Sequence, residues 1–222
     1  MIYRYERKFV FPALDIGRAK SSICLSPLFF SQVHTPRRVN NVYYDTADMR
    51  HYRAAINGCS RRLKVRIRWY EDELSSAQLE LKIRHASVGT KIIVKLPELT
   101  IDSFFCEGGV RKILGDSDAI NHKALEVIGE DCLYPVLYNS YSREYYLSKL
   151  TAIRATIDTD LRFSDPGGLG DHMTTSRLCS EGVIEFKYPL SLGIDEVLGF
   201  STVPWRLSRF SKYVTGLSML RN

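Results

Sequence analysis

Several segments of the chain alternate between apolar and charged residues, which is the pattern of a β-strand with one buried face. In Leu63–Tyr70, Val65 and Ile67 lie on one face, and Arg66 and Arg68 lie on the other. The same alternation recurs in Tyr3–Phe9, Leu79–Ile83, Lys91–Leu96, Ile153–Asp158 and Ile184–Tyr188. These segments predict an antiparallel sheet with one apolar face and one polar face.

Fewer segments have the character of helices. A short helix is predicted near residues 14–25, and a second helical region over Val110–Ile128 with a break at Gly115–Asp118. A third is predicted for Pro204–Val214, because proline is favoured at the first position of a helix. Ser164–Gly182 is rich in glycine and serine and is expected to be a long surface loop.

The polar faces of the predicted strands carry mainly arginine and lysine, with single glutamates among them. Like charges on neighbouring strands destabilise a sheet, so such faces are unusual for a surface in contact only with water. A sheet that closes on itself, with cations in the lumen and helices against the outer wall, accounts for both faces. The predicted fold is therefore α+β, a closed antiparallel β-barrel tunnel with flanking helices. A β-sandwich with basic strands facing solvent is the alternative.

Charge and composition narrow the choice of partner. The chain of 222 residues carries a formal net charge of +6, which favours an anionic partner such as a nucleic acid, a phosphorylated molecule or an anionic membrane surface. A single domain over residues 1–222 is expected, since the sequence contains no linker-like tract. No apolar stretch approaches the length of a membrane span and no signal sequence opens the chain, so a soluble, cytoplasmic protein is expected.

A set of short motifs resembles a known family in its order and spacing. The motifs are Tyr5–Phe9, Lys64–Tyr70, Leu79–Lys82, Ser142–Tyr146, Arg154–Asp158, Ile184–Tyr188 and Phe210–Tyr213. Together they resemble the VTC domain, the polyphosphate polymerase domain of the vacuolar transporter chaperone, within the triphosphate tunnel metalloenzyme superfamily. The resemblance implies a closed tunnel and a metal-dependent phosphotransferase that moves the γ-phosphate of ATP onto a polyphosphate chain.

The resemblance also implies roles for individual residues. Phosphate contacts are implied for Lys8, Arg66, Arg68, Lys82, Lys91, Arg143, Arg154, Lys187 and Lys212. Among these, a direct part in catalysis is expected of Lys8, Arg66, Arg68, Lys82 and Lys212. Glu185 matches the metal-binding glutamate of the family, and Glu6 and Glu80 are further candidates as metal ligands or salt-bridge partners. Carboxylate oxygens suit Mn²⁺ or Mg²⁺, the expected cofactor.

One departure separates branches of the superfamily. The hydrolase branch opens with Glu-x-Glu-x-Lys, whereas this chain has Arg4 in the first glutamate position, ahead of Glu6 and Lys8. The change removes an oxygen ligand and a candidate base for water, which favours polymerase over hydrolase. A triphosphate hydrolase and a non-catalytic polyphosphate-binding module remain as alternatives. ATP and polyphosphate are the expected partners, nucleic acid is not, and the resemblance leaves room for a separate membrane-protein partner.

Overall fold

A computed structural model describes residues 4–85, 88–96, 99–105, 109–115, 119–169, 176–189, 191–192 and 202–221. The strands are β1 (Arg4–Pro12), β2 (Phe30–Asp45), β3 (Arg61–Tyr70), β4 (Glu73–His85), β5 (Val88–Lys95), β6 (Tyr134–Ser148), β7 (Arg154–Ser164), β8 (Arg177–Leu178) and β9 (Glu181–Pro189). The α-helices are α1 (Ile16–Cys24), α2 (Arg50–Ile56), α3 (Gly109–Leu114), α4 (Ala119–Ile128) and α6 (Lys212–Arg221). Short 3-10 helices are η1 (Ala13–Asp15), η2 (Ile101–Phe105) and η3 (Pro166–Leu169).

The strands form one sheet in the order β1-β9-β7-β6-β2-β3-β4-β5, with β8 paired to β7. The register is antiparallel for β1 with β9, β9 with β7, and β2 through β5. The prediction of an antiparallel sheet with helices beside it is confirmed. The prediction of a closed barrel is wrong as far as hydrogen bonds are concerned, because no strand pairing among the described residues closes this order. Alternation identifies the two faces of each strand, but closure depends on strand number, tilt and stagger, which alternation does not determine.

The chain divides into two compact units that share strands β2, β6 and β7. Unit 1 comprises residues 1–38, 140–162 and 178–211, and unit 2 comprises residues 39–139, 163–177 and 212–222. Each unit has its own hydrophobic core.

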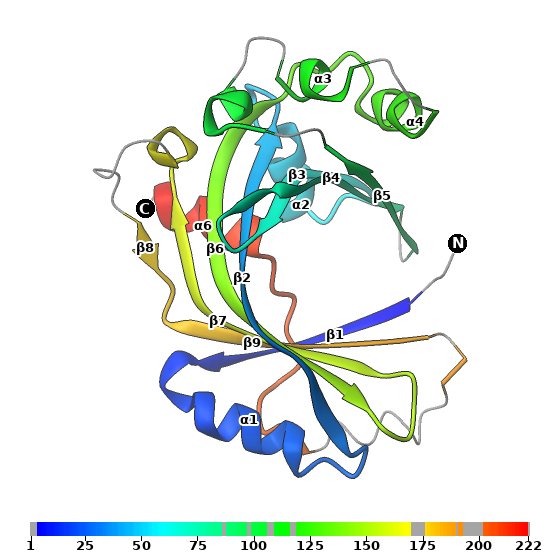
Figure 1. The fold of residues 1–222 in the computed structure, drawn as a ribbon, viewed down its shortest axis with the longest axis vertical. Helices are drawn as coiled ribbons and strands as arrows, with labels where there is room; N and C mark the ends of the chain where they lie inside the picture. Colours follow the sequence, from blue (N-terminus) through cyan, green and yellow to red (C-terminus); the bar gives the residue numbers. More distant parts are fainter. Residues whose placement is uncertain are drawn as a thin grey trace. The chain divides into compact units, whose positions relative to one another are not determined.

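The core of unit 1 forms between the apolar faces of its strands and helix α1 (Figure 1). Phe9 lies opposite Ile184 in the pairing of β1 with β9, and both side chains are buried. Ala19 and Ile23 of α1 are fully buried against this face. Helix α1 and η1 together correspond to the helix predicted near residues 14–25, which is confirmed.

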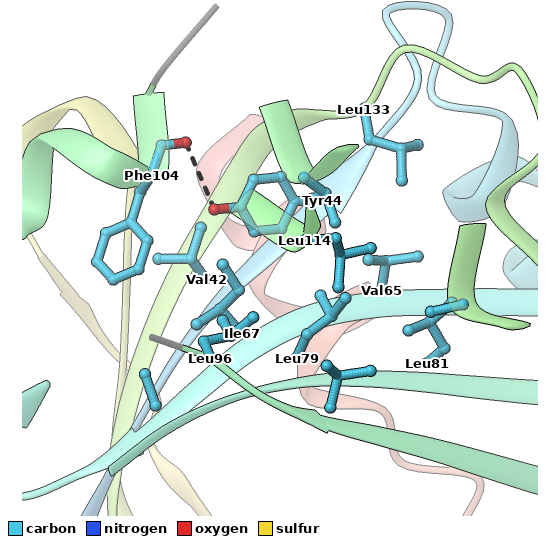
Figure 2. Packing of buried hydrophobic residues seen from close by; sticks show 14 of the residues in the cluster. Val42, Tyr44, Val65, Ile67, Leu79, Leu81, Leu96, Phe104, Leu114 and Leu133 are labelled. Atoms are coloured by element: carbon cyan, nitrogen blue, oxygen red, sulfur yellow. Dashed lines mark hydrogen bonds between the residues drawn. The ribbon is translucent and has the colours of Figure 1, made fainter. Parts of the chain in front are cut away.

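The core of unit 2 lies on the apolar face of β3, β4 and β5, which helices α3 and α4 cover (Figure 1). Val65, Ile67, Leu79 and Leu81 have no exposed surface, as their alternating positions predict. Figure 2 shows how these side chains pack beneath Tyr44, whose hydroxyl donates a hydrogen bond to the backbone oxygen of Phe104 at 3.4 Å.

The predicted helical region over Val110–Ile128 is observed as two helices, α3 and α4. Gly115, which opens the predicted break, follows α3 directly in a left-handed conformation, with φ of 58°. Residues 116–118 of the break lie outside the described residues.

The helix predicted for Pro204–Val214 is wrong over most of its length, since α6 begins only at Lys212. The residues before it run beside β1 instead. The backbone N–H of Ser208 donates to the oxygen of Lys8 at 2.8 Å, and Leu207 forms a β-bridge with Phe9. These contacts with β1 satisfy backbone groups that a helix would satisfy internally, and so they override the local signal from Pro204.

The predicted loop over Ser164–Gly182 is shorter than expected. It contains η3 and the two-residue strand β8, and Gly182 already belongs to β9. Residues 170–175 of this segment lie outside the described residues.

None of the helices in the described part of the chain combines the length and apolarity that a membrane-spanning helix requires.

Close packing at Gly216 of α6 generates a test of the unit 2 core. A Cβ atom at this position would overlap the Phe163 ring and the Leu137 side chain. We expect Gly216→Ala to lower the free energy of unfolding by about 1–3 kcal/mol, since overpacking outweighs the gain in helix propensity. Gly17→Ala is the matched control in α1, because no non-neighbouring atom of the described residues lies within 4 Å of the new Cβ. Urea denaturation would contradict this account if both variants were stabilised alike.

Candidate functional site

The polar face of β3, β4 and β5 in unit 2 carries cations that stand directly opposite one another. The pairing places residues in four rows across the three strands. From one end of the strands to the other, the rows are Arg62–Arg84–Gly89, Lys64–Lys82–Lys91, Arg66–Glu80–Ile93 and Arg68–Gln78–Lys95. We refer to these as rows 1 to 4. Leu63 and Ile83, which lie opposite each other between rows 1 and 2, pack against the hydrophobic core. The residues of the rows therefore share the other face of the sheet.

Glu80 in row 3 is the only carboxylate in these rows, and it is 4% exposed. Its Oε2 accepts a hydrogen bond from Nε of Arg66 at 2.7 Å and lies 2.5 Å from Nη2. Its Oε1 accepts from Nζ of Lys91 at 2.6 Å. Arg68 approaches Oε2 at 3.9 Å. Glu80 is therefore a salt-bridge centre that orients three cations of the face.

The electrostatics of this cluster follow from burial and charge. Burial alone would raise the pKa of Glu80, but Arg66, Arg68 and Lys91 together hold that pKa far below its usual value. Burial lowers the pKa of Lys91, and the opposite charge of Glu80 offsets part of this effect. Glu80 is thus ionised at neutral pH, and the cations around it keep fixed directions.

Arg66 and Arg68 also donate hydrogen bonds to neutral polar side chains that the sequence did not predict. Nε of Arg68 donates to Oδ1 of Asn41 at 2.8 Å, and Nδ2 of Asn41 donates to Oδ1 of Asn139 at 3.0 Å. Nη1 of Arg66 donates to the hydroxyl of Tyr43 at 3.1 Å. The signal that could have found the asparagines is an amide next to an apolar or aromatic segment, since Asn41 directly precedes Val42, Tyr43 and Tyr44 in the sequence.

Helix α6 reaches this cluster through an aromatic contact. The rings of Tyr43 and Tyr213 stack with centroids 5.1 Å apart, and the Tyr213 hydroxyl donates to the buried carboxylate of Asp45. Lys212, the half-buried first residue of α6, precedes Tyr213 directly. The stacking therefore anchors the end of α6 that carries Lys212 beside the residue that binds Arg66.

Unit 1 contains a second cluster around a buried glutamate. Glu185 of β9 is 7% exposed and lies opposite Lys8 of β1 in the register. Its Oε1 is 2.9 Å from Nζ of Lys187, and its Oε2 is 3.9 Å from Nζ of Lys8. Nζ of Lys8 also donates to the backbone oxygen of Phe210 at 3.1 Å. Burial would raise the pKa of Glu185, but Lys187, Lys8 and Arg143 lower it well below its usual value.

Arg143 forms a salt bridge with Asp158, a partner that the sequence did not predict. Its Nε and Nη2 bind the two oxygens of Asp158 at 2.6 and 2.7 Å, and Asp158 has no exposed surface. Burial would lower the pKa of Arg143, but Asp158 raises it well above its usual value. The guanidinium also lies over the Tyr141 ring, 5.1 Å from its centroid. The buried Arg143–Asp158 salt bridge therefore links β6 to β7 inside unit 1.

The remaining predicted residues of unit 1 lie near its surface. Arg154 of β7 and Glu6 of β1 both lie opposite Lys187 of β9, and both side chains are exposed. Glu6 therefore occupies the row next to Glu185 rather than the same row.

The predicted residues are thus divided between the units. Unit 2 contains Arg66, Arg68, Glu80, Lys82, Lys91 and Lys212, and unit 1 contains Glu6, Lys8, Arg143, Arg154, Glu185 and Lys187.

The arrangement of the carboxylates shows which kind of divalent metal site the described residues can form. No group of three or more aspartate, glutamate, histidine or cysteine side chains suited to a metal occurs among the described residues. Glu80 and Glu185 are instead single carboxylates with cations around them. This donor set fits Mg²⁺ or Mn²⁺ held mainly by phosphate oxygens and water with one protein carboxylate, and it does not fit a metal held by protein ligands alone.

The Arg143–Asp158 pair can be tested by truncation. We expect Arg143→Ala to lower the free energy of unfolding by about 3–5 kcal/mol, because it leaves Asp158 charged and buried without its partner. Arg154→Ala removes an exposed arginine from the next strand and should change stability by less than about 0.5 kcal/mol. Equal effects of the two variants in urea denaturation would show that the buried pair does not organise unit 1.

The lowered pKa of Glu80 gives a dependence of stability on pH. A carboxylate whose pKa is depressed by folding stabilises the folded state above its unfolded pKa, and this contribution is lost as pH falls below it. The ordinary value for glutamate is 4.5. We therefore expect Glu80→Gln to destabilise the protein at pH 7, and the difference from the unmodified protein to shrink below about pH 4.5. Glu73→Gln, an exposed change on the same strand, is the control for denaturation at both pH values.

Comparison with known proteins gives the family. The model of the VTC domain matches residues 3–221. No curated protein matches the chain. Among solved structures, a Hippeastrum protein described as a candidate adenylyl cyclase, HpAC1, with a dominant triphosphatase activity, aligns at 14% identity and a TM-score of 0.56 over 99% of this chain and 96% of its own. A candidate adenylate cyclase from Bacillus halodurans aligns at 15% identity and a TM-score of 0.52 over 93% and 92%. The two structures share the fold, and the match over nearly the whole chain shows that this protein belongs to the VTC domain family.

Proposed function

We propose that the protein is a polyphosphate polymerase, which binds a nucleoside triphosphate and transfers its γ-phosphoryl group to a phosphate chain. The observation that carries the proposal is row 2, in which Lys64, Lys82 and Lys91 stand side by side on three adjacent strands. Like charges in directly opposed positions destabilise a sheet. A ligand with several negative oxygens offsets that repulsion, and a phosphate chain supplies such oxygens at regular intervals.

The type of cation also supports a phosphate ligand. Arg66 and Arg68 lie two residues apart on the same face of β3, in rows 3 and 4. Guanidinium groups bind phosphate oxygens through two parallel hydrogen bonds, and lysines add point charges. Glu80 fixes the orientation of the guanidinium of Arg66 before any ligand binds. The face is therefore preorganised for phosphate.

Family membership supports polyphosphate as the substrate class, since the VTC domain is a polyphosphate polymerase domain. The Hippeastrum neighbour, with its triphosphatase activity, supports hydrolysis as the second candidate. Arg4, which replaces a carboxylate of the hydrolase pattern, lies opposite Pro189 at the end of the β1–β9 pairing. This replacement favours transfer to phosphate over transfer to water.

The chemistry needs little from the protein beyond binding and charge. A terminal oxygen of the acceptor chain attacks the γ-phosphorus, the bond from that phosphorus to the bridging oxygen breaks, and the nucleoside diphosphate leaves with the electron pair. The attacking oxygen is already ionised at neutral pH, so no general base is required. Arg66, Arg68 and Lys82 would hold the phosphates and neutralise the charge that develops on the equatorial oxygens. A divalent ion held mainly by phosphate oxygens and water would add charge neutralisation when bound.

The test is incubation with ATP and Mn²⁺ or Mg²⁺, with the products separated by chain length. A ladder of polyphosphates is expected. Orthophosphate as the only product would replace the proposal with a triphosphatase, and triphosphate binding without turnover would replace it with a binding module.

Row 2 provides a variant that tests the phosphate site. Lys82→Met keeps the side-chain stem and removes one of three neighbouring charges, so we expect about tenfold weaker binding of tripolyphosphate by a protein that still folds. Lys123→Met, on the exposed surface of α4, changes the net charge equally and should not alter this binding. Calorimetry measures the binding, and thermal unfolding establishes that each variant is folded. Unchanged tripolyphosphate binding by the Lys82 variant would contradict the role of row 2.

A further inference from the structure

Row 1 extends the cationic face beyond the residues that a triphosphate requires. Arg62 lies opposite Arg84, and Arg84 lies opposite Gly89. The four rows are separated by three steps of two residues, so the face runs for about 20 Å along the strands. That length is well over the length of three linked phosphates. A nucleoside triphosphate alone leaves one end of the face uncovered.

Exposure changes along the β4 positions of this face. Glu80 in row 3 is 4% exposed, whereas Lys82 in row 2 and Arg84 in row 1 are exposed. On the flanking strands, Arg68 in row 4 is 7% exposed, Lys95 in the same row is exposed, and Arg62 in row 1 is half-buried. Along β4 the face therefore leads from a buried charge to cations that are open to solvent.

The third position of row 1 has no side chain. A Cβ atom built at Gly89 would make only an ordinary contact with the described residues, 3.8 Å from the backbone oxygen of Ile83. At the other side of the row, on β3, Nε of Arg62 is buried and has no hydrogen-bond partner among the described residues. A buried donor without an acceptor is unfavourable, and phosphate oxygens are strong acceptors for guanidinium groups. Row 1 thus combines two arginines, an unsatisfied donor and a position without a side chain.

We propose that row 1 is a binding site for the distal phosphates of a long chain, which leaves the protein past Arg62, Arg84 and Gly89. The inference rests on the proposed function and deepens it. The reacting phosphates lie near rows 2 to 4, and the older part of the chain lies over row 1. The protein consequently binds linear polyphosphate more tightly than tripolyphosphate, and row 1 accounts for the difference.

The test places a negative charge at Gly89. The Cβ atom of Gly89→Glu makes only an ordinary contact with the described residues. Its carboxylate would pair with the row 1 arginines and repel phosphate. Gly89→Gln has nearly the same shape without the charge and is the matched control. At physiological ionic strength, where charges are screened beyond about 8 Å, we expect Gly89→Glu to weaken binding of long linear polyphosphate about tenfold. Its affinity for tripolyphosphate should change much less, and Gly89→Gln should behave like the unmodified protein with both probes.

A second variant makes the result independent of any single substitution. Arg84→Gln should reproduce the selective loss for long polyphosphate, and thermal unfolding establishes that each variant is folded. Arg66→Ala is the positive control, because it should weaken binding of both probes.

Two other outcomes have separate meanings. If the unmodified protein binds both probes, and the Gly89→Glu and Arg84→Gln variants lose them equally or not at all, the row 1 site is wrong and the proposed function stands. If the unmodified protein binds neither probe, the proposed function fails, and the row 1 site fails with it.

Discussion

The structure depends on a buried carboxylate that holds cations together on a sheet face. Isolated charges are costly to bury, and cations alone in directly opposed positions repel one another. Glu80 offsets both costs for Arg66, Arg68 and Lys91, and Glu185 does the same for Lys8 and Lys187 in the other unit. Each carboxylate binds more than one cation and fixes the positions of their charges, and fixed positive charge is the property that a phosphate-binding site requires.

The repulsion between cations on this face is offset by hydrophobic burial on the opposite face of the same strands. Val65, Ile67, Leu79 and Leu81 alternate with the row residues and are completely buried. Burial of aliphatic side chains contributes roughly 1.5–3 kcal/mol each, whereas like-charge pairs across strands cost a fraction of that. The alternation therefore lets one strand supply stability on one face and unfavourable, functional charge on the other. The repulsion between the cations lowers the stability of the free protein, and a bound anion relieves this repulsion, which contributes to the affinity for the anion.

The sequence predicted the faces of the strands well, because alternation depends only on neighbouring residues. It could not predict which carboxylate each cation meets, since this depends on the register between strands. Glu80 was a candidate metal ligand or salt-bridge partner, and only the register shows that it lies between Arg66 and Lys91. The partner of Arg143 was missed for the same reason, although Asp158 lies only fifteen residues away along the chain. The failed helix at Pro204 shows the converse case, in which contacts with β1 overrode a correct local preference.

The length of the cationic face bears on the choice between transfer and hydrolysis. Both reactions use the same contacts to the triphosphate, so those contacts cannot select the attacking group. A water molecule needs no further binding, whereas an acceptor chain gains affinity from every phosphate that the protein contacts beyond the reacting ones. Holding the acceptor in place raises its effective concentration at the γ-phosphorus and so favours it over water. Cations beyond the span of a triphosphate do not help a triphosphatase, but they would hold the acceptor chain of a polymerase, and under the proposed function this is the part that Arg62 and Arg84 take.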